Sequence, residues 1–265
     1  MSMPSTSLRF ARGLPLLILI AIAVWSAPAL AERTRDVDLR APLSSGATLE
    51  IDDVNGSIAV TPTAGGNVMV HAHASTDGAD PGPVVRTSRS GNRLIVCAVF
   101  PGDEGSDANG CSHNHMGGND DHFRVDLRVG VPRGIAVDAH NVNGPVSATG
   151  LGGIVNVSDV NGAITIRTKS NAGASNVNGA IEANFSPRGN ARFTTVNGPV
   201  TLIVPTGADA TFRADTLSGA ISSDGVDLST HNGQFVGHSA TATLGAGHAR
   251  ISVHTVNGAV RLERR

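Results

Sequence analysis

The chain alternates apolar and polar residues in short runs that glycine-rich turns separate. Positions 181, 183 and 185 are apolar within Ile181–Phe185, and positions 200, 202 and 204 are apolar within Val200–Val204. Alternation with a period of two is typical of a β-strand that buries one face. No segment after residue 31 shows a convincing period of 3.6 residues. The pattern therefore predicts an all-β chain of short strands with almost no helix.

A short string organises these strands into a repeat. Val-Asn-Gly, followed by a small residue and then Val or Ile, occurs six times, with its asparagines at Asn55, Asn143, Asn161, Asn178, Asn197 and Asn257. Leu217-Ser218-Gly219 is a degenerate copy, and the spacings from Asn143 to Ser218 are 18, 17, 19 and 21 residues. Self-similarity at this period indicates a repeat architecture in which each unit contributes two strands and two turns.

Two arrangements fit a two-strand repeat. Asn-Gly is a strong signal for a type I′ hairpin, which would give an antiparallel meander. In such a turn the fourth residue donates its N–H to the first, but Pro145 and Pro199 occupy that position and have no N–H. If all copies share one shape, the sequence favours a β-solenoid whose corners are formed by the six asparagines. A ligand-binding row is the alternative use of these asparagines.

The composition fits a thin repeat with little room for rings. The 265 residues include 32 Gly and only 7 Phe, 1 Trp and no Tyr. With 40% hydrophobic and 16% charged residues, the chain is neither a disordered acidic tail nor a coiled coil. The net charge of −2 and the scarcity of stacking aromatics argue against binding to nucleic acid.

Residues 1–31 have the pattern of a signal peptide. Two arginines precede an apolar run at Gly13–Trp25, and Ala29–Ala31 fits a small-residue cleavage site before Glu32. The run is shorter than the roughly 20 residues that span a bilayer. The sequence therefore predicts export to the periplasm or the cell surface. It predicts no transmembrane segment after cleavage, and a single repeat domain at 32–265.

One segment, 101–122, breaks the repeat and is predicted to be an inserted loop. It is rich in Gly, Asp and Asn and contains Cys111, whereas Cys97 precedes it. In an oxidising compartment two lone cysteines most often form one disulfide. Free thiols or two metal ligands are the alternatives.

The same loop suggests a metal site. An H-x-H followed by D-D-H contains ligand types that divalent transition metals prefer, and the candidates are His113, His115, Asp120, Asp121 and His122. No standard zinc spacing is matched, so a solvated loop is the alternative. The histidines elsewhere are interpreted as surface residues, including His140, His231, His238, His248 and His254.

The sequence contains no recognisable catalytic arrangement. The G-x-S-x-G, H-E-x-x-H, P-loop and calcium-binding nonapeptide motifs do not occur. No carboxylate recurs at one place in neighbouring repeats, as a glycan-cleaving groove would require. We therefore expect no enzymatic activity and no cofactor.

The motifs resemble the bacterial "putative adhesin" family of unknown function. The resemblance rests on the Val-Asn-Gly array, on Val129–Gly134, and on the closing Leu244–Gly247 and Thr255–Leu262 segments, and it extends roughly from Ala47 to Leu262. It implies an exported, β-solenoid-like domain at the cell envelope, and it brings no catalytic residues.

These observations predict an exported, non-enzymatic structural or adhesin-like protein. It would present a rigid β surface to an envelope or cell-surface partner that the sequence does not identify. The alternative is a periplasmic metal-binding protein that uses the loop at 111–122.

Overall fold

The computed structural model describes residues 33–76, 84–99, 111, 123–232 and 237–265. Ala31–Arg265 forms one compact unit. The described residues are strands, turns and bends, and none of them is helical. It follows that none of them belongs to an apolar helix of bilayer-spanning length. The predicted signal peptide lies outside the described residues.

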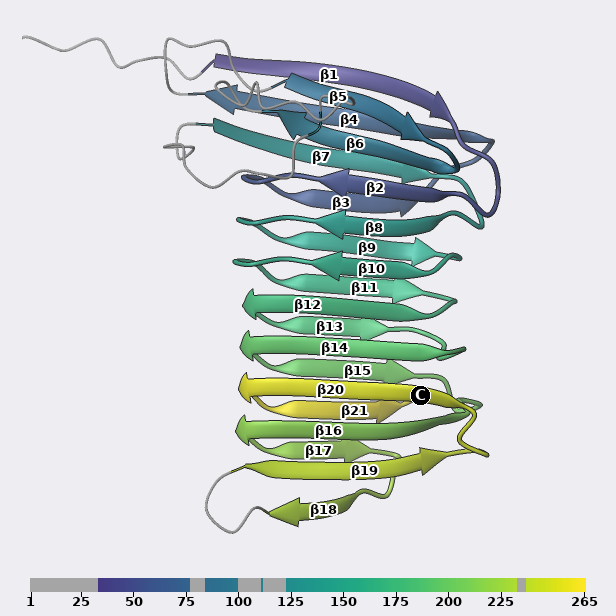
Figure 1. The fold of residues 1–265 in the computed structure, drawn as a ribbon, viewed down its shortest axis with the longest axis vertical. Coiled ribbons are helices and arrows are strands. Elements are labelled where there is room, and N and C mark those ends of the chain that lie inside the picture. Colours follow the sequence, from purple (N-terminus) through teal and green to yellow (C-terminus); the bar gives the residue numbers. More distant parts are fainter. Residues whose placement is uncertain (1–32, 77–83, 100–110, 112–122, 233–236) are drawn as a thin grey trace, which may run out of the picture. The chain divides into compact units, whose positions relative to one another are not determined.

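The strands form two large mixed sheets (Figure 1). In spatial order, the ten-stranded sheet A contains β1 (Arg33–Pro42), β4 (Asn67–Thr76), β7 (Phe123–Val131), β3 (Ile58–Pro62), β9 (Val146–Leu151), β11 (Ile164–Thr168), β13 (Ile181–Asn184), β15 (Val200–Val204), β21 (Val260–Arg264) and β17 (Ile221–Asp224). The eleven-stranded sheet B contains β18 (Ser229–Asn232), β19 (His238–Leu244), β16 (Ala210–Ser218), β20 (Ala249–Asn257), β14 (Asn190–Asn197), β12 (Ala172–Asn178), β10 (Val155–Ser158), β8 (Ala136–His140), β2 (Thr48–Asp52), β6 (Arg93–Val99) and β5 (Val84–Ser90).

Every Val-Asn-Gly string joins a strand of sheet B to a strand of sheet A. From β8 to β17 consecutive strands alternate between the sheets, and each strand from β8 to β15 pairs in parallel with a strand one repeat away. Ile164, Ile181 and Val200 thus pair in sequence along sheet A. A hairpin would place the two flanking strands side by side in one sheet, so the hairpin alternative is wrong at these sites.

Small apolar side chains fill the space between the sheets. The inward positions alternate along each strand and are almost all Val, Ile, Leu or Ala. Phe185, Phe193 and Phe212 are the largest fully buried side chains among the described residues. The rings of Phe185 and Phe193 lie 5.3 Å apart between centroids and are tilted by 51°. The scarcity of aromatic residues therefore matches the narrow space between the two layers.

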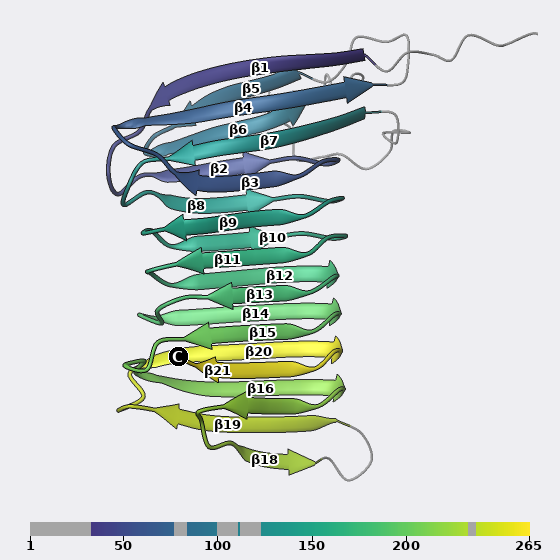
Figure 2. The same ribbon diagram turned by 180° about the vertical axis from the view of Figure 1, so that it is seen from behind.

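At one repeat, the order of the strands within the sheets differs from their order in the sequence. β20 and β21 lie between the β14–β15 pair and the β16–β17 pair, as the yellow strands among green ones show (Figures 1 and 2). β20 pairs in parallel with both β14 and β16, and β21 pairs in parallel with both β15 and β17. β19 then runs antiparallel to β16, and β18 antiparallel to β19.

The other end of the two sheets uses antiparallel strands as well. β1 pairs with β4 and β4 with β7 in sheet A, whereas β5 pairs with β6 in sheet B, all antiparallel. These pairings make both sheets mixed: sheet B has antiparallel strands at both ends, whereas sheet A has them only at the β1 end. The Val-Asn-Gly pattern predicted the parallel part only.

Glycine is required where neighbouring repeats meet at the corners. A Cβ atom at Gly144 would lie 2.0 Å from the carbonyl oxygen of Gly56, and one at Gly198 would lie 2.1 Å from that of Gly179. Both glycines also have positive φ, +127° and +157°, which other residues rarely adopt. We call the whole set the glycine row: Gly56, Gly144, Gly162, Gly179, Gly198, Gly258 and Gly219.

We expect Gly198→Ala to lower the free energy of unfolding by about 2–5 kcal/mol, because the new methyl group adds both overpacking and backbone strain. The control is Gly207→Ala, since no heavy atom lies within 4 Å of a Cβ atom built there. That change is expected to stay within about 0.5 kcal/mol. Chemical denaturation followed by circular dichroism measures both, and equal effects of the two variants would contradict the packing argument.

Candidate functional site

The six corner asparagines form one continuous row of side-chain hydrogen bonds. Asn143 Nδ2 donates to Asn55 Oδ1, and each later member donates to the one before it, at distances of 2.8–3.0 Å. Their backbones also pair, since Gly144 N–H donates to the Asn161 carbonyl oxygen at 2.8 Å. The asparagine row comprises Asn55, Asn143, Asn161, Asn178, Asn197 and Asn257, and all of them are exposed except Asn55, which is half-buried. Ser218 stands beside Asn257 at its end.

A second polar row, which the sequence analysis missed, lies two residues before the first. The inner polar row consists of Asp53, Asn141, Asp159, Asn176, Thr195, Thr255 and Thr216, all buried. Asn141 Nδ2 donates to the carbonyl oxygens of Gly56 and Gly144, and Asn176 Nδ2 donates to that of Gly162. These amides donate hydrogen bonds to carbonyl oxygens of the glycine row, which would otherwise be buried at the corner without a donor.

Two members of the inner polar row are carboxylic acids. Burial raises the pKa of Asp53 well above its ordinary value of 3.8, against a smaller lowering by the Val54 N–H group. Burial likewise raises the pKa of Asp159 to about 6, although the Val160 and Asn161 N–H groups favour the ionised form. Burial dominates because it removes the water that stabilises a carboxylate.

The surroundings of Asp159 explain why its protonated form fits better. A Cβ atom at Gly162 would lie 2.5 Å from Asp159 Oδ2 and 2.2 Å from the Gly144 carbonyl oxygen, so these two oxygens face the same small space. Asp159 Oδ2 has no hydrogen-bond partner among the described residues. A proton on Oδ2 removes the negative charge from this buried position and lets Oδ2 donate, whereas an ionised Oδ2 would face a carbonyl oxygen with no donor between them.

Exposed apolar side chains alternate with the two polar rows. Val160, Val177, Val196 and Val256 are 36–39% exposed, and Leu217 is 52% exposed. Each lies between a member of the inner polar row and the asparagine row or, for Leu217, Ser218. We call these five residues the outer valine row. An apolar stripe beside an amide stripe is suited to contact with a repetitive surface, and it offers no nucleophile or general base.

The predicted disulfide is confirmed. Cys97, on β6, is bonded to Cys111 with an S–S distance of 1.99 Å, and there is no free cysteine. Both are buried with Ile95 in a small apolar cluster separate from the core, and the partly buried Val99 packs against this cluster. The proposed metal ligands His113, His115, Asp120, Asp121 and His122 lie outside the described residues.

Several histidines that were interpreted as surface residues have carboxylate partners. His71 and His73 on β4 contact Asp38 and Asp36 on β1 at 3.0 and 2.7 Å. The hydrogen bond that the His248 ring makes to the Asp209 carboxylate raises the pKa of His248, which is exposed. The two pairs on β1 and β4 are neighbours, whereas Asp209 and His248 lie far from them in the sequence. His140 differs because it lies in a group with two carboxylates, which is considered below.

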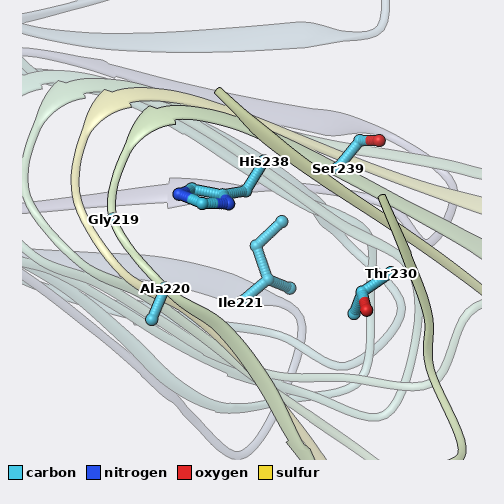
Figure 3. A pocket seen from close by; sticks show the side chains of 6 residues that line it. All are labelled: Gly219, Ala220, Ile221, Thr230, His238 and Ser239. Atoms are coloured by element: carbon cyan, nitrogen blue, oxygen red, sulfur yellow. The ribbon is translucent and has the colours of Figure 1, made fainter. Parts of the chain in front are cut away.

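A hollow of about 370 Å³ lies beside β17, the last strand of sheet A. Figure 3 shows its lining: Gly219, Ala220, Ile221, Thr230, His238 and Ser239. Ile221 is only partly buried, whereas Ile181 and Val200 at the same position of other repeats are almost fully buried. The hollow therefore reflects a strand that has a neighbour in sheet A on one side only.

We expect Asp159→Asn to be more stable than the wild type at pH 7 by about 1–3 kcal/mol, since each pKa unit corresponds to about 1.4 kcal/mol. The folded-state pKa of about 6 lies above the ordinary value of 3.8, so ionisation costs the folded protein stability as the pH rises between these values. The difference should shrink as the pH falls from 6 to 4 and vanish below that.

Denaturation midpoints from pH 4 to pH 8 measure this difference. Asp224→Asn is the control, because Asp224 is exposed on β17; it is expected to change stability by less than about 0.5 kcal/mol. An Asp159→Asn variant that is less stable than the wild type at pH 7 would show that the carboxylate is favourable there.

Comparison with known proteins gives little beyond this geometry. No family model matches the chain, and no curated protein matches it. The resemblance to the "putative adhesin" family therefore has no support from a family model.

Solved structures described as adhesion proteins show weak likeness. A "putative cell adhesion protein" from Clostridium sporogenes ATCC 15579 is 10% identical, with 88% of this chain and 100% of that chain covered and a TM-score of 0.48. A "putative adhesin" from Bacteroides fragilis NCTC 9343 is 12% identical, with 87% and 97% covered and a TM-score of 0.29. One from Parabacteroides merdae ATCC 43184 is 8% identical, with 87% and 96% covered and a TM-score of 0.23. At these scores the likenesses carry no argument about the function of this chain.

Proposed function

We propose that the protein is an exported, non-enzymatic envelope protein. Its repeats form a β-solenoid, and it binds an envelope or cell-surface component through the outer valine row and the asparagine row. The observation that carries this proposal is the alignment of the same exposed side chains along one corner of successive repeats. The binding partner is defined only by this chemistry: a surface that accepts alternating apolar and amide contacts.

The pairing of neighbouring repeats supports the solenoid. One turn consists of a strand in sheet B, a Val-Asn-Gly corner, a strand in sheet A and a second corner. The next turn repeats this path, with Val155 paired to Ala172 in sheet B and Ile164 paired to Ile181 in sheet A. Each turn has too small a core to be stable alone, so neighbouring turns stabilise each other. Such a stack is rigid because its backbone hydrogen bonds run along the whole array.

The position of the exposed rows supports a binding role. Neighbouring parallel strands are about 4.8 Å apart, so the rows repeat at that interval. The Asn178 and Asn197 side chains already hydrogen-bond along the row, which fixes their orientation before any partner binds. A pre-ordered surface loses little conformational entropy on binding. The proposal that the protein is not an enzyme rests on the lack of catalytic motifs in the sequence.

Export is supported by the predicted leader and by the cysteine pair. A structural disulfide such as Cys97–Cys111 is typical of proteins that fold in an oxidising compartment. We therefore propose a periplasmic or cell-surface location for a mature chain that begins at Glu32.

Intact-mass analysis of the protein recovered from the envelope of an expressing bacterium tests the export proposal. The expected result is a chain that begins at Glu32, because cleavage after Ala31 fits the small-residue rule. A chain that retains Met1 in the cytoplasm would contradict export.

Co-sedimentation with isolated envelopes of the source cells tests the surface. We expect the triple variant Val160→Ser, Val177→Ser and Val196→Ser to bind about tenfold more weakly, because it removes roughly 1–2 kcal/mol of apolar contact. Ile154→Ser is the matched control, since Ile154 is 46% exposed between β9 and β10, away from the Val-Asn-Gly corners. Circular dichroism checks that each variant is folded.

Two results would go against the proposal. Equal binding by the triple variant and the wild type would exclude the outer valine row as the contact surface. Turnover of a cell-wall glycan by the purified protein would exclude the non-enzymatic role.

A further inference from the structure

Three metal-ligating side chains meet on the outer face of sheet B, where β2 and β8 lead into the first two Val-Asn-Gly corners. Leu49 and Ile51 of β2 are buried in the core. By strand alternation, Glu50 and Asp52 project from the opposite face. His140, at the end of the neighbouring strand β8, pairs in parallel register with Asp52. Its carbonyl oxygen accepts a hydrogen bond from the Asp53 N–H group at 3.0 Å, which ties the ends of the two strands together.

These side chains are close enough to share one ion. One oxygen of Glu50, one oxygen of Asp52 and one ring nitrogen of His140 all lie within 4.8 Å of one another. Two ligand atoms at first-row metal distances of about 2.0–2.2 Å lie at most about 4.4 Å apart, so the three side chains need only a small adjustment to share a single ion. All three ligands are attached to paired strands, so their backbone positions are fixed by the sheet.

Burial and charge distinguish this group from an ordinary acidic surface. Glu50 is only 6% exposed, and both carboxylate oxygens of Asp52 are buried. Arg93 on β6 forms an ion pair with Glu50 and lies 3.9 Å from Asp138. Asp138 on β8 pairs in register with Glu50 on β2. A cation bound beside carboxylates that are partly removed from water is held more strongly than one at an exposed surface, because opposite charges attract more strongly there.

The neighbouring disulfide determines the type of ligand atoms. Cys97 pairs in register with Asp52 on the side of β2 opposite to His140. Because Cys97 is bonded to Cys111, neither sulfur is a thiolate that could bind metal. The donors are therefore two oxygens and one nitrogen, a set that suits zinc or manganese better than copper(I). The buried cluster of Ile95 and the two cysteines provides an apolar wall beside the group.

We propose that Glu50, Asp52 and His140 form a binding site for a divalent transition-metal ion. The exposed His140 provides the route of entry, and the two carboxylates supply the negative charge. Water occupies the remaining coordination positions of the bound ion. This site contains no residue of the outer valine row. Evidence for or against metal binding therefore does not decide the proposed surface-binding function.

Titration with Zn²⁺ tests the site. The disulfide-bonded, untagged protein is stripped with a chelator and titrated by calorimetry, and we expect one equivalent to bind. His140→Ala and Asp52→Asn should each weaken zinc binding by about tenfold or more, since each removes a ligand. His71→Ala is the matched control, because His71 also contacts a carboxylate but lies on β4 of sheet A. Its zinc affinity should equal that of the wild type.

A spectroscopic measurement separates a lost ligand from a damaged fold. With Cu²⁺ as a probe, electron paramagnetic resonance should show nitrogen coupling in the wild type that His140→Ala loses. The unfolding midpoint without metal should be the same for both proteins, because the exposed His140 side chain contributes little to packing.

Each outcome of the titration is decisive. A second variant, His113→Ala with His115→Ala and His122→Ala, removes the histidines of the loop. Weaker zinc binding by both His140→Ala and Asp52→Asn supports the site, whatever the affinity of this loop variant. The proposal is overturned if the wild type binds no stoichiometric zinc, or if either single variant binds it with wild-type affinity. If the loop variant alone binds zinc more weakly than the wild type, the metal lies in the loop and the proposal is wrong.

Discussion

The close approach of backbones at the Val-Asn-Gly corners determines the geometry of the parallel array. Along the glycine row, the backbone of each glycine lies so near a carbonyl oxygen of the adjacent repeat that even a methyl group would collide with it. This contact fixes the rise from one repeat to the next and keeps the strands in register on both sides of the corner. Once the register is fixed, equivalent side chains of successive repeats must lie beside one another.

The remaining rows follow from that register. Asparagine is long enough to reach its neighbour along the row and has both a donor and an acceptor, so Asn161 can bond to Asn143 and Asn178 at once. Inside the corner, amides at Asn141 and Asn176 satisfy the glycine carbonyls. The valines between the two polar positions have no inward space to fill and remain partly exposed. One backbone contact thus leads to a polar interior, an apolar stripe and an amide stripe.

The sequence predicted the parts of this fold that depend on local periodicity. Alternation identified strands such as β13 to β16, and the prolines at Pro145 and Pro199 correctly argued against hairpins. The inner polar row was missed because strand alternation assigns Asp159 and Asn176 to inward positions, where apolar residues are expected. Their signal was nevertheless present: the residue two before each corner Asn is always Asp, Asn or Thr.

Contacts between distant segments were beyond the reach of periodicity. Asp52 and His140 are 88 residues apart in the sequence and meet only because β2 and β8 pair in register. No local pattern distinguishes His140 from an ordinary surface histidine. The position of β20 and β21 between earlier strands could not be predicted either. Their Val-Asn-Gly string is the same as in the repeats that pair in chain order.

The placement of β20 and β21 makes the order of folding differ from the order of synthesis. Strands β8 to β15 can pair with earlier strands as soon as they emerge. In contrast, β16 and β17 pair in parallel only with β20 and β21, and β18 and β19 join the array only through β16. The segment from Ala210 to Leu244 must therefore wait for residues that follow it before it can dock. Growth of the two sheets is sequential up to β15, and strands β16 to β21 are completed together.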